Sequence, residues 1–321
     1  MKRRCAAAAC VMAFVVSRGS AAQQPERVRR IGWLGNSAPV TAEGIAVWDA
    51  FRLELRRLGW IEGRNLAFER RFAEGDVDRI PLLARELIDR KVDLIVAVNG
   101  PAARAAQQAT ATLPIVFASV TNPVEQGLVA TLARPAGNLT GMATQGDETV
   151  GKRLQLLKEM LPRTLRIAVL ADASDTGAAL LGAAAALGIE LLMARASRAE
   201  DLPAAIASGA RSDAWFITDQ ALYFAQRKTV VELIAQQRRP AIYPQAVYVH
   251  AGGLASYSVD LKDHFRRAAG VVDKVLRGAR PADIPVEQPT RFELTINLET
   301  AADLGLKIPQ SVLLRADEVI E

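Results

Sequence analysis

The stretch DLIVAVNGPAARAAQQATATLPIVFASVTNP, residues 93–123, contains a complete strand–helix–strand unit. Residues 93–98 are almost continuously apolar, which is typical of a strand buried on both faces of a parallel sheet. Pro101, a residue favoured at the first helical position, opens a helix over residues 102–109. Residues 114–118 form the next apolar strand. A unit of this kind predicts an α/β protein.

The same alternation continues in both directions along the chain. Further strands are predicted over residues 31–34, 66–69, 165–170, 189–193, 214–218, 241–243, 254–257 and 292–296. Helices are predicted over residues 47–58, 80–88, 176–187, 199–208, 221–237 and 261–276, from apolar residues at 3.6-residue spacing and from glycine stops. Several βα units in each half of the chain predict two sheets of similar build, and therefore two lobes.

Two segments interrupt this alternation and predict connections between the lobes. Residues 134–149 are rich in Gly, Thr and Pro, and we take them as the first crossing. Pro281, Pro285 and Pro289 favour an extended crossing near the C-terminus. We expect residues 28–145 and 258–284 in lobe 1, and residues 146–257 and 285–321 in lobe 2. Repeated crossing makes a hinge, which suggests closure around a ligand.

The first 22 residues have the pattern of a secretory signal peptide. Lys2, Arg3 and Arg4 precede an apolar stretch over residues 5–16, and small residues end at Ala22, the expected cleavage site. The apolar stretch is shorter than the ~20 residues that a membrane-spanning helix needs. We therefore expect a periplasmic protein. The alternatives are a buried N-terminal helix and a lipoprotein modified at Cys10.

Removal of this segment changes the charge balance and the thiol content. The full chain has 40 Lys and Arg against 35 Asp and Glu, a net charge of +5. Four of the cations lie within residues 1–22, so the mature chain has 36 against 35, or +1. Both cysteines, Cys5 and Cys10, lie there too. A nearly neutral chain without cysteine gives no support for nucleic-acid binding, disulfides or thiolate catalysis.

Motifs of common enzyme classes are absent from the sequence, including the P-loop, G-x-G-x-x-G, G-x-S-x-G and H-E-x-x-H. We expect no enzyme, cofactor or metal. An enzyme would need a reactive group of residues around His250, Asp219 and Asp172. We expect His264 at the surface, beside Arg266 and Arg267, whereas His250 could face a cleft.

Ligands of open α/β sheets bind beyond the carboxyl ends of the strands. In the first half, the residues at these positions are Asn36, Ser37, Asn99, Gly100, Pro101, Ser119, Thr121 and Asn122. In the second half, they are Asp172, Ser174, Asp175, Asp219, Gln220, Tyr243 and Gln245. The helix start at Asn99 would favour a carboxylate, and Asp219 could pair with an ammonium group. The alternative is that these residues serve only as helix caps and turns.

Residues 121–141, TNPVEQGLVATLARPAGNLTG, resemble the signature of the ABC-transporter substrate-binding family that includes tryptophan- and tyrosine-type amino acid binding proteins. LRRLGWIEGRNLAFERRFAEGD from Leu55 and ARPADIPVEQPTRFELTINLETAADLGLKIP from Ala279 match as well. The resemblance implies a type I periplasmic-binding-protein fold, with two Rossmann-like lobes joined by crossings. The chain differs at Asn122, where relatives have an acid, and at Asn99–Pro101, where relatives commonly have Gly-Thr-Pro.

The sequence and the resemblance together predict an exported solute receptor of an ABC importer. It would bind an amino acid or a similar small carboxylate between the lobes and deliver it to a membrane permease and its ATPase partner. The alternative is a periplasmic module that presents its ligand-bound form to a membrane sensor. The intramolecular features of the two are the same.

Overall fold

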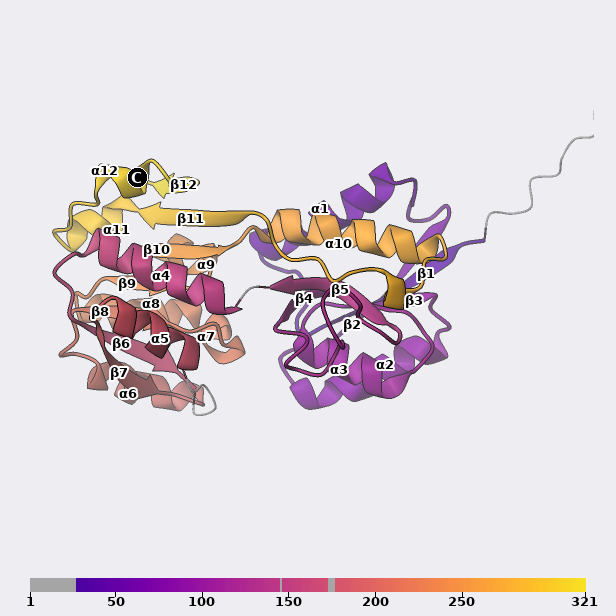
Figure 1. Ribbon diagram of the computed structural model, residues 1–321, viewed down its shortest axis with the longest axis horizontal. Coiled ribbons are helices and arrows are strands. Elements are labelled where there is room, and N and C mark those ends of the chain that lie inside the picture. The colour runs from indigo at the N-terminus through magenta and orange to yellow at the C-terminus, as the bar shows by residue number, and fades with distance from the viewer. Residues whose placement is uncertain (1–26, 145, 173–176) are drawn as a thin grey trace, which may run out of the picture.

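The structure is a computed structural model, and it describes residues 27–144, 146–172 and 177–321. The expected signal peptide, residues 1–22, lies outside these ranges. The described chain forms two lobes that lie side by side, each with a sheet and helices on both of its faces (Figure 1). This arrangement confirms the predicted α/β fold with largely parallel sheets.

Sheet 1, in the first lobe, has five strands within the described residues and is parallel throughout. In spatial order, they are β2 (Leu66–Phe72), β1 (Arg29–Gly35), β3 (Leu94–Ala97), β4 (Ile115–Thr121) and β5 (Leu139–Thr144). The central strand β3 is fully buried, as its uninterrupted apolar sequence predicts. Helices α2 (Ile80–Asp89) and α3 (Gly100–Ala109) cover one face, and α1 (Ala42–Arg57) and α10 (Leu261–Leu276) cover the other.

Sheet 2, in the second lobe, has seven strands in the described part of the chain. In spatial order, they are β12 (Glu318–Ile320), β11 (Phe292–Asn297), β10 (Ala255–Val259), β9 (Ala241–Tyr243), β8 (Ala214–Ile217), β6 (Arg166–Ala171) and β7 (Glu190–Arg195). The β10–β11 pair is antiparallel, and the other pairs are parallel. The sheet is therefore mostly parallel.

Helices also cover both faces of sheet 2. One face packs against α4 (Gly146–Met160), α5 (Ala178–Ala186), α11 (Leu298–Asp303) and α12 (Gln310–Leu313). The other packs against α6 (Leu202–Ser208), α7 (Ala221–Ala225), α8 (Arg227–Gln236) and α9 (Ala246–His250). Three short 3-10 helices, η1 (Val77–Arg79), η2 (Ala199–Asp201) and η3 (Pro281–Asp283), complete the described elements.

The chain passes between the lobes three times within the described ranges. It leaves β5 for α4, leaves β10 for α10, and returns after η3 to β11. Before this last crossing it runs beside β5, where Glu287 N donates to Gly141 O at 3.0 Å and Ala143 N donates to Glu287 O at 2.8 Å. These connections form the predicted hinge (Figure 1). The lobe boundaries at residues 145, 258 and 285 remain our proposal.

The structure corrects the interpretation of residues 134–149 as a crossing. Residues 139–144 form β5, an edge strand paired with β4, and α4 begins at Gly146. Their Gly and Thr content resembles a loop, but Gly141 is needed here: its φ is +154°, and a Cβ atom would lie 2.0 Å from Phe117 O. The helix expected over residues 221–237 is also divided, into α7 and α8.

The expectation that His264 lies at the surface is wrong. His264 is 1% exposed in the first turns of α10, on the same stripe as Ala268 and Val271. Spacings of four and seven residues place side chains on one helical face. This position, and not the charge of the neighbouring arginines, determines that His264 is buried. Both ring nitrogens are buried without a hydrogen-bond partner in the described structure.

Burial makes the stability of the fold sensitive to acid at His264. Desolvation, with a smaller contribution from Arg267, lowers its pKa to about 4, while Asp263, Glu287 and Asp260 act in the opposite direction. The unfolded chain binds this proton near pH 6.5, so stability is complete above that pH and falls as the pH drops toward 4. We expect His264 to contribute a loss of about 3 kcal/mol in the free energy of unfolding between pH 7 and pH 4.

Urea denaturation at several pH values between 7 and 4 tests this prediction. His264→Met removes the titrating group and should flatten the acid-side fall relative to the wild type. His250→Gln removes the other histidine, which is exposed, and should leave the fall attributed to His264 in place. Wild-type and His264→Met curves that run parallel over this range would contradict the prediction.

Candidate functional site

The carboxyl edges of the two sheets face each other. β5 ends at Thr144 where the chain enters the second lobe, and β10 ends at Val259 where it enters the first. Because parallel strands share one carboxyl edge, both crossings leave from that edge. Between the lobes, His250 Nδ1 at the end of α9 lies 3.7 Å from Glu43 Oε1 in the first turn of α1. The start of α1 and the end of α9 therefore lie near each other.

The first lobe brings four of the predicted residues to this edge, at the ends of β1 and β4. Asn36 has a buried Oδ1 atom that lacks a partner in the described structure, and Ser37 beside it is exposed. Thr121 Oγ1 lies 2.8 Å from Thr144 Oγ1 on β5. Asn122 Nδ2 donates to Glu125 Oε2 at 3.1 Å. Hydroxyl and amide groups thus line this lobe's carboxyl edge.

Helix α3 begins at the same edge with Asn99, Gly100 and Pro101. Contacts within the protein already use part of their capacity to bind a ligand. Asn99 Oδ1 accepts a hydrogen bond from Ala102 N at 3.0 Å, which is the capping role that the sequence left open. Pro101 has no backbone N–H to offer. The Gln126 side chain lies against Gly100, with Oε1 3.0 Å from the position of a Cβ atom. The helix start is therefore a weaker anion site than the sequence predicts.

The second lobe places Asp219 at the carboxyl edge, directly after β8 and Thr218. Gln245 Nε2, after β9, donates to Asp219 Oδ1 at 3.1 Å. The carboxylate is exposed to water but closely surrounded by protein, and desolvation raises its pKa, while Arg153 and the Gln245 amide act in the opposite direction. A carboxylate in this position can receive an ammonium group.

Arg153 on α4 is a residue that the sequence analysis missed. It is 4% exposed, its Nη1 donates to Ile217 O at 2.9 Å, and its Cζ lies 4.5 Å from the centre of the Phe216 ring. Burial lowers its pKa to about 10, and Asp219 and Tyr248 oppose that shift. The sequence did contain a signal for its burial: Arg153 lies four and seven residues before Leu157 and Met160, and therefore on the same apolar stripe of the helix. We call Arg153, Asp219, Gln245 and Tyr248 the lobe-2 polar cluster.

Two other predicted residues lie behind or beside this cluster. Tyr243 is 2% exposed, and its ring stacks on Tyr248 with centroids 5.2 Å apart. The structure therefore corrects its assignment as a direct contact, because the ring is packed in the core. The Asp172 carbonyl accepts a hydrogen bond from the Arg195 guanidinium. Ser174 and Asp175 lie outside the described residues.

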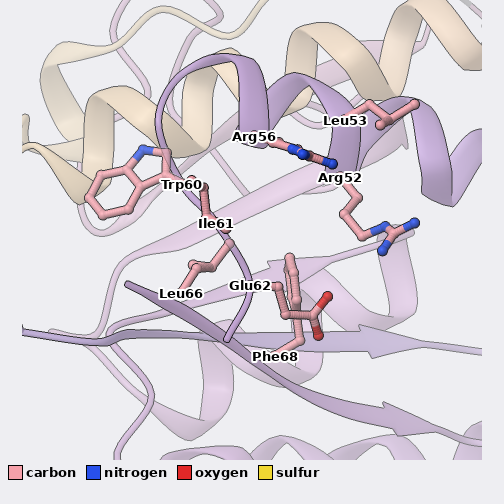
Figure 2. A pocket seen from close by; sticks show the side chains of 8 residues that line it. All are labelled: Arg52, Leu53, Arg56, Trp60, Ile61, Glu62, Leu66 and Phe68. Carbon is pink, nitrogen blue, oxygen red and sulfur yellow. The ribbon is translucent and has the colours of Figure 1, made fainter. Parts of the chain in front are cut away.

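A small pocket lies elsewhere, at the amino end of β2 (Figure 2). Its volume is about 130 Å³, and its lining includes Arg52, Arg56, Trp60 and Leu66. Because Leu66 begins β2, the pocket lies at the opposite edge of sheet 1 from the polar residues above. Among the described residues, no helix is long and apolar enough to cross a membrane, and no group of three or more His, Cys, Asp or Glu side chains is arranged to hold a metal ion.

Two lobes with facing polar edges and a multi-stranded hinge define a protein of the type I periplasmic-binding-protein fold. Residues 45–320 match the family model described as ABC transporter substrate binding protein. The chain belongs to this family of solute-binding proteins.

Individual proteins that are similar to this chain give the comparison more detail. The tyrosine-binding protein of Clostridioides difficile (strain R20291) is 28% identical over 255 residues, which are 78% of this chain and 73% of that protein. A conserved domain protein of Vibrio cholerae is 28% identical, with a TM-score of 0.82 over 91% of this chain and 100% of its own. An ABC domain of Streptococcus pneumoniae in complex with L-Trp is 25% identical, with a TM-score of 0.84 and the same coverage.

Proposed function

We propose that this protein is the exported receptor of an ABC importer and binds an amino acid or a similar small carboxylate between its lobes. The observation that carries the proposal is the complementary chemistry of the two carboxyl edges. Sheet 2 presents the Asp219 carboxylate, and sheet 1 presents the hydroxyl and amide groups of Ser37, Thr121 and Asn122. An amino acid has an ammonium group for the first and a carboxylate for the second.

The family relatives support this choice of ligand class, because one is named for tyrosine and another was solved with L-Trp. Ligand contacts from both lobes would stabilise a closed form, and that form would dock on the permease. The Asn36, Asn99, Gly100, Pro101 and Asp172 positions complete our proposed contact region.

A ligand screen tests the proposal. Protein purified after export is mixed with single amino acids, including tryptophan, tyrosine, leucine and isoleucine, and with small carboxylates that lack an amine. A true ligand stabilises the folded protein by mass action and therefore raises its melting temperature. At a concentration 100 times its Kd, it adds about 2.7 kcal/mol to the free energy of unfolding. Native mass spectrometry then gives the stoichiometry, for which we expect one. If none of the amino acids stabilises the protein, the assignment of amino acids as its ligands is overturned.

Export is a separate part of the proposal. We propose cleavage after Ala22 and release into the periplasm, supported by the cationic start and short apolar stretch of residues 1–22. Intact-mass measurement of the protein from its native cells should give a chain that begins at Gln23. A mass that includes Met1 or Lys2 would contradict export, and a lipid attached to Cys10 would contradict release.

A further inference from the structure

The third crossing lies against lobe 1 for several residues before it reaches lobe 2 (Figure 1). Thr140 Oγ1 donates to Ile284 O at 2.7 Å, and the Glu287 backbone makes two hydrogen bonds with β5. The Ile284 and Val286 side chains are buried in the hydrophobic cores on the two faces of sheet 1. Backbone and side-chain contacts therefore bind residues 284–287 to lobe 1.

Arg267 on α10 extends this attachment by three residues. Its Nη2 atom donates to Glu287 Oε2 at 2.8 Å, and its Nη1 atom donates to Gln288 O at 2.9 Å and to Thr290 Oγ1 at 3.1 Å. The planar guanidinium can serve all three acceptors at once. Because α10 packs on sheet 1, these contacts hold the crossing to lobe 1. We call them the Arg267 clamp.

The Arg267 clamp is partly shielded from water. The Arg267 side chain is 21% exposed and the Glu287 side chain 29% exposed. Water and salt therefore screen this ion pair less than they screen a pair at the open surface.

The attachment of the chain changes to lobe 2 directly after the clamp. Phe292 begins β11 and pairs with Val259 of β10 in sheet 2. Between the lobes, Asp260 N on the second crossing donates to Arg291 O on the third at 3.1 Å. The two crossings are therefore joined to each other at the point where each passes from one lobe to the other.

We propose that Arg267 is a positioning residue for lobe closure, because its clamp makes residues 284–290 part of lobe 1. The second and third crossings then bend together, at Asp260 and Arg291. This refines our third lobe boundary from residue 285 to residue 291. Without the clamp, bending would spread along the third crossing, and the two crossings would no longer share one pivot. The inference rests on the proposed function for closure on a ligand, but the clamp belongs to the ligand-free protein.

Hydrogen exchange in the ligand-free exported protein tests the clamp. Arg267→Met removes the guanidinium and keeps the apolar part of the side chain. The Glu287 amide, which donates to Gly141 O, should then exchange about tenfold faster, because loss of a hydrogen bond between charged groups makes local opening easier. The Ile95 amide, which donates to Pro114 O inside sheet 1, should change much less. An unchanged Glu287 amide, or equal acceleration at both amides, would overturn the proposal.

Arg280→Met is the matched control. It removes an exposed arginine that pairs with Asp283 at the start of the same segment, and it should leave both amides as in the wild type. Arg267→Lys keeps a charge opposite Glu287 but has one terminal nitrogen, so its Glu287 amide should exchange at an intermediate rate. If Arg267→Met does not fold, Arg267→Gln takes its place, and the same outcomes decide.

Distances between spin labels test the position of the pivot. The chain beyond residue 22 has no cysteine, so labels can be introduced in pairs. Gln288→Cys carries one label, because only the backbone of Gln288 contacts Arg267. Leu82→Cys on α2 or Arg211→Cys before β8 carries the other, and both positions are exposed.

Saturation with an amino acid ligand should leave the 82–288 distance constant and change the 211–288 distance, because residue 288 moves with lobe 1. A change in the 82–288 distance would overturn the proposal. If neither distance changes with any ligand that binds, closure in the proposed function fails, and hydrogen exchange alone decides whether the clamp holds the crossing to lobe 1.

Discussion

Asp219→Asn is expected to weaken binding of an amino acid by about tenfold or more, because a hydrogen bond to a charged group contributes about 1.5–3 kcal/mol. The substitution keeps the size and the hydrogen-bonding capacity of the side chain but removes its charge. Asp219 is exposed to water in the ligand-free protein, and closure on a ligand would exclude that water and strengthen the attraction that the variant loses. Isothermal titration calorimetry on the exported protein gives the two affinities.

The interpretation depends on two controls. A ligand analogue without the amine should bind the wild type and Asp219→Asn with similar affinity, since it has no ammonium group to lose. Asp283→Asn makes the same charge change at an exposed residue paired with Arg280 and should leave affinity unchanged. If Asp219→Asn binds the amino acid as tightly as the wild type, Asp219 is not part of the site.

Gly141→Ala is expected to cause the largest loss of stability, about 3 kcal/mol or more. The added Cβ atom would lie 2.0 Å from Phe117 O and 2.7 Å from Phe117 N, and backbone atoms cannot move aside as a flexible side chain can. Gly141 also accepts the Glu287 hydrogen bond beside the third crossing. The substitution therefore disturbs the β4–β5 pair and the hinge together. Urea denaturation at pH 7 measures the change in the free energy of unfolding.

Gly270→Ala in α10 is the matched control. It makes the same chemical change where, apart from the neighbouring backbone of α10 itself, nothing lies within 4 Å of the added methyl group. Alanine is a better helix former than glycine, so the free energy of unfolding of this variant should rise by up to about 1 kcal/mol. If the free energy of unfolding of Gly141→Ala lies within about 0.5 kcal/mol of the wild-type value, the steric argument is contradicted.

The sequence predicted strands most clearly where the apolar pattern is continuous. Residues 93–98 and 214–218 satisfy that pattern, and the structure places β3 and β8 within them. β5 was missed because Gly141 and its threonines are typical of a loop in isolation. The close approach of the Phe117 backbone, which requires glycine there, is a tertiary feature that local pattern cannot show.

The site was predictable only to the level of the sheet edge. The rule that ligands bind beyond carboxyl ends placed Asp219 and Thr121 at the carboxyl edge, where the structure has them, but it could not tell Tyr243, whose ring packs inward, from a residue whose side chain is accessible there. Arg153 precedes β6 in the chain and reaches the end of β8 from a helix, so no strand-end rule includes it. His264 shows the same limit, because its charged neighbours concealed an inward-facing stripe.

Solution X-ray scattering of the exported protein with and without its amino acid tests the central claim, that the ligand is held between the two lobes. A ligand contacted from both lobes favours the closed arrangement, so saturation should lower the radius of gyration and the maximum dimension. Calorimetry on the same samples establishes that the site is filled. Superimposable scattering curves from the ligand-free protein and the saturated protein would contradict closure between the lobes.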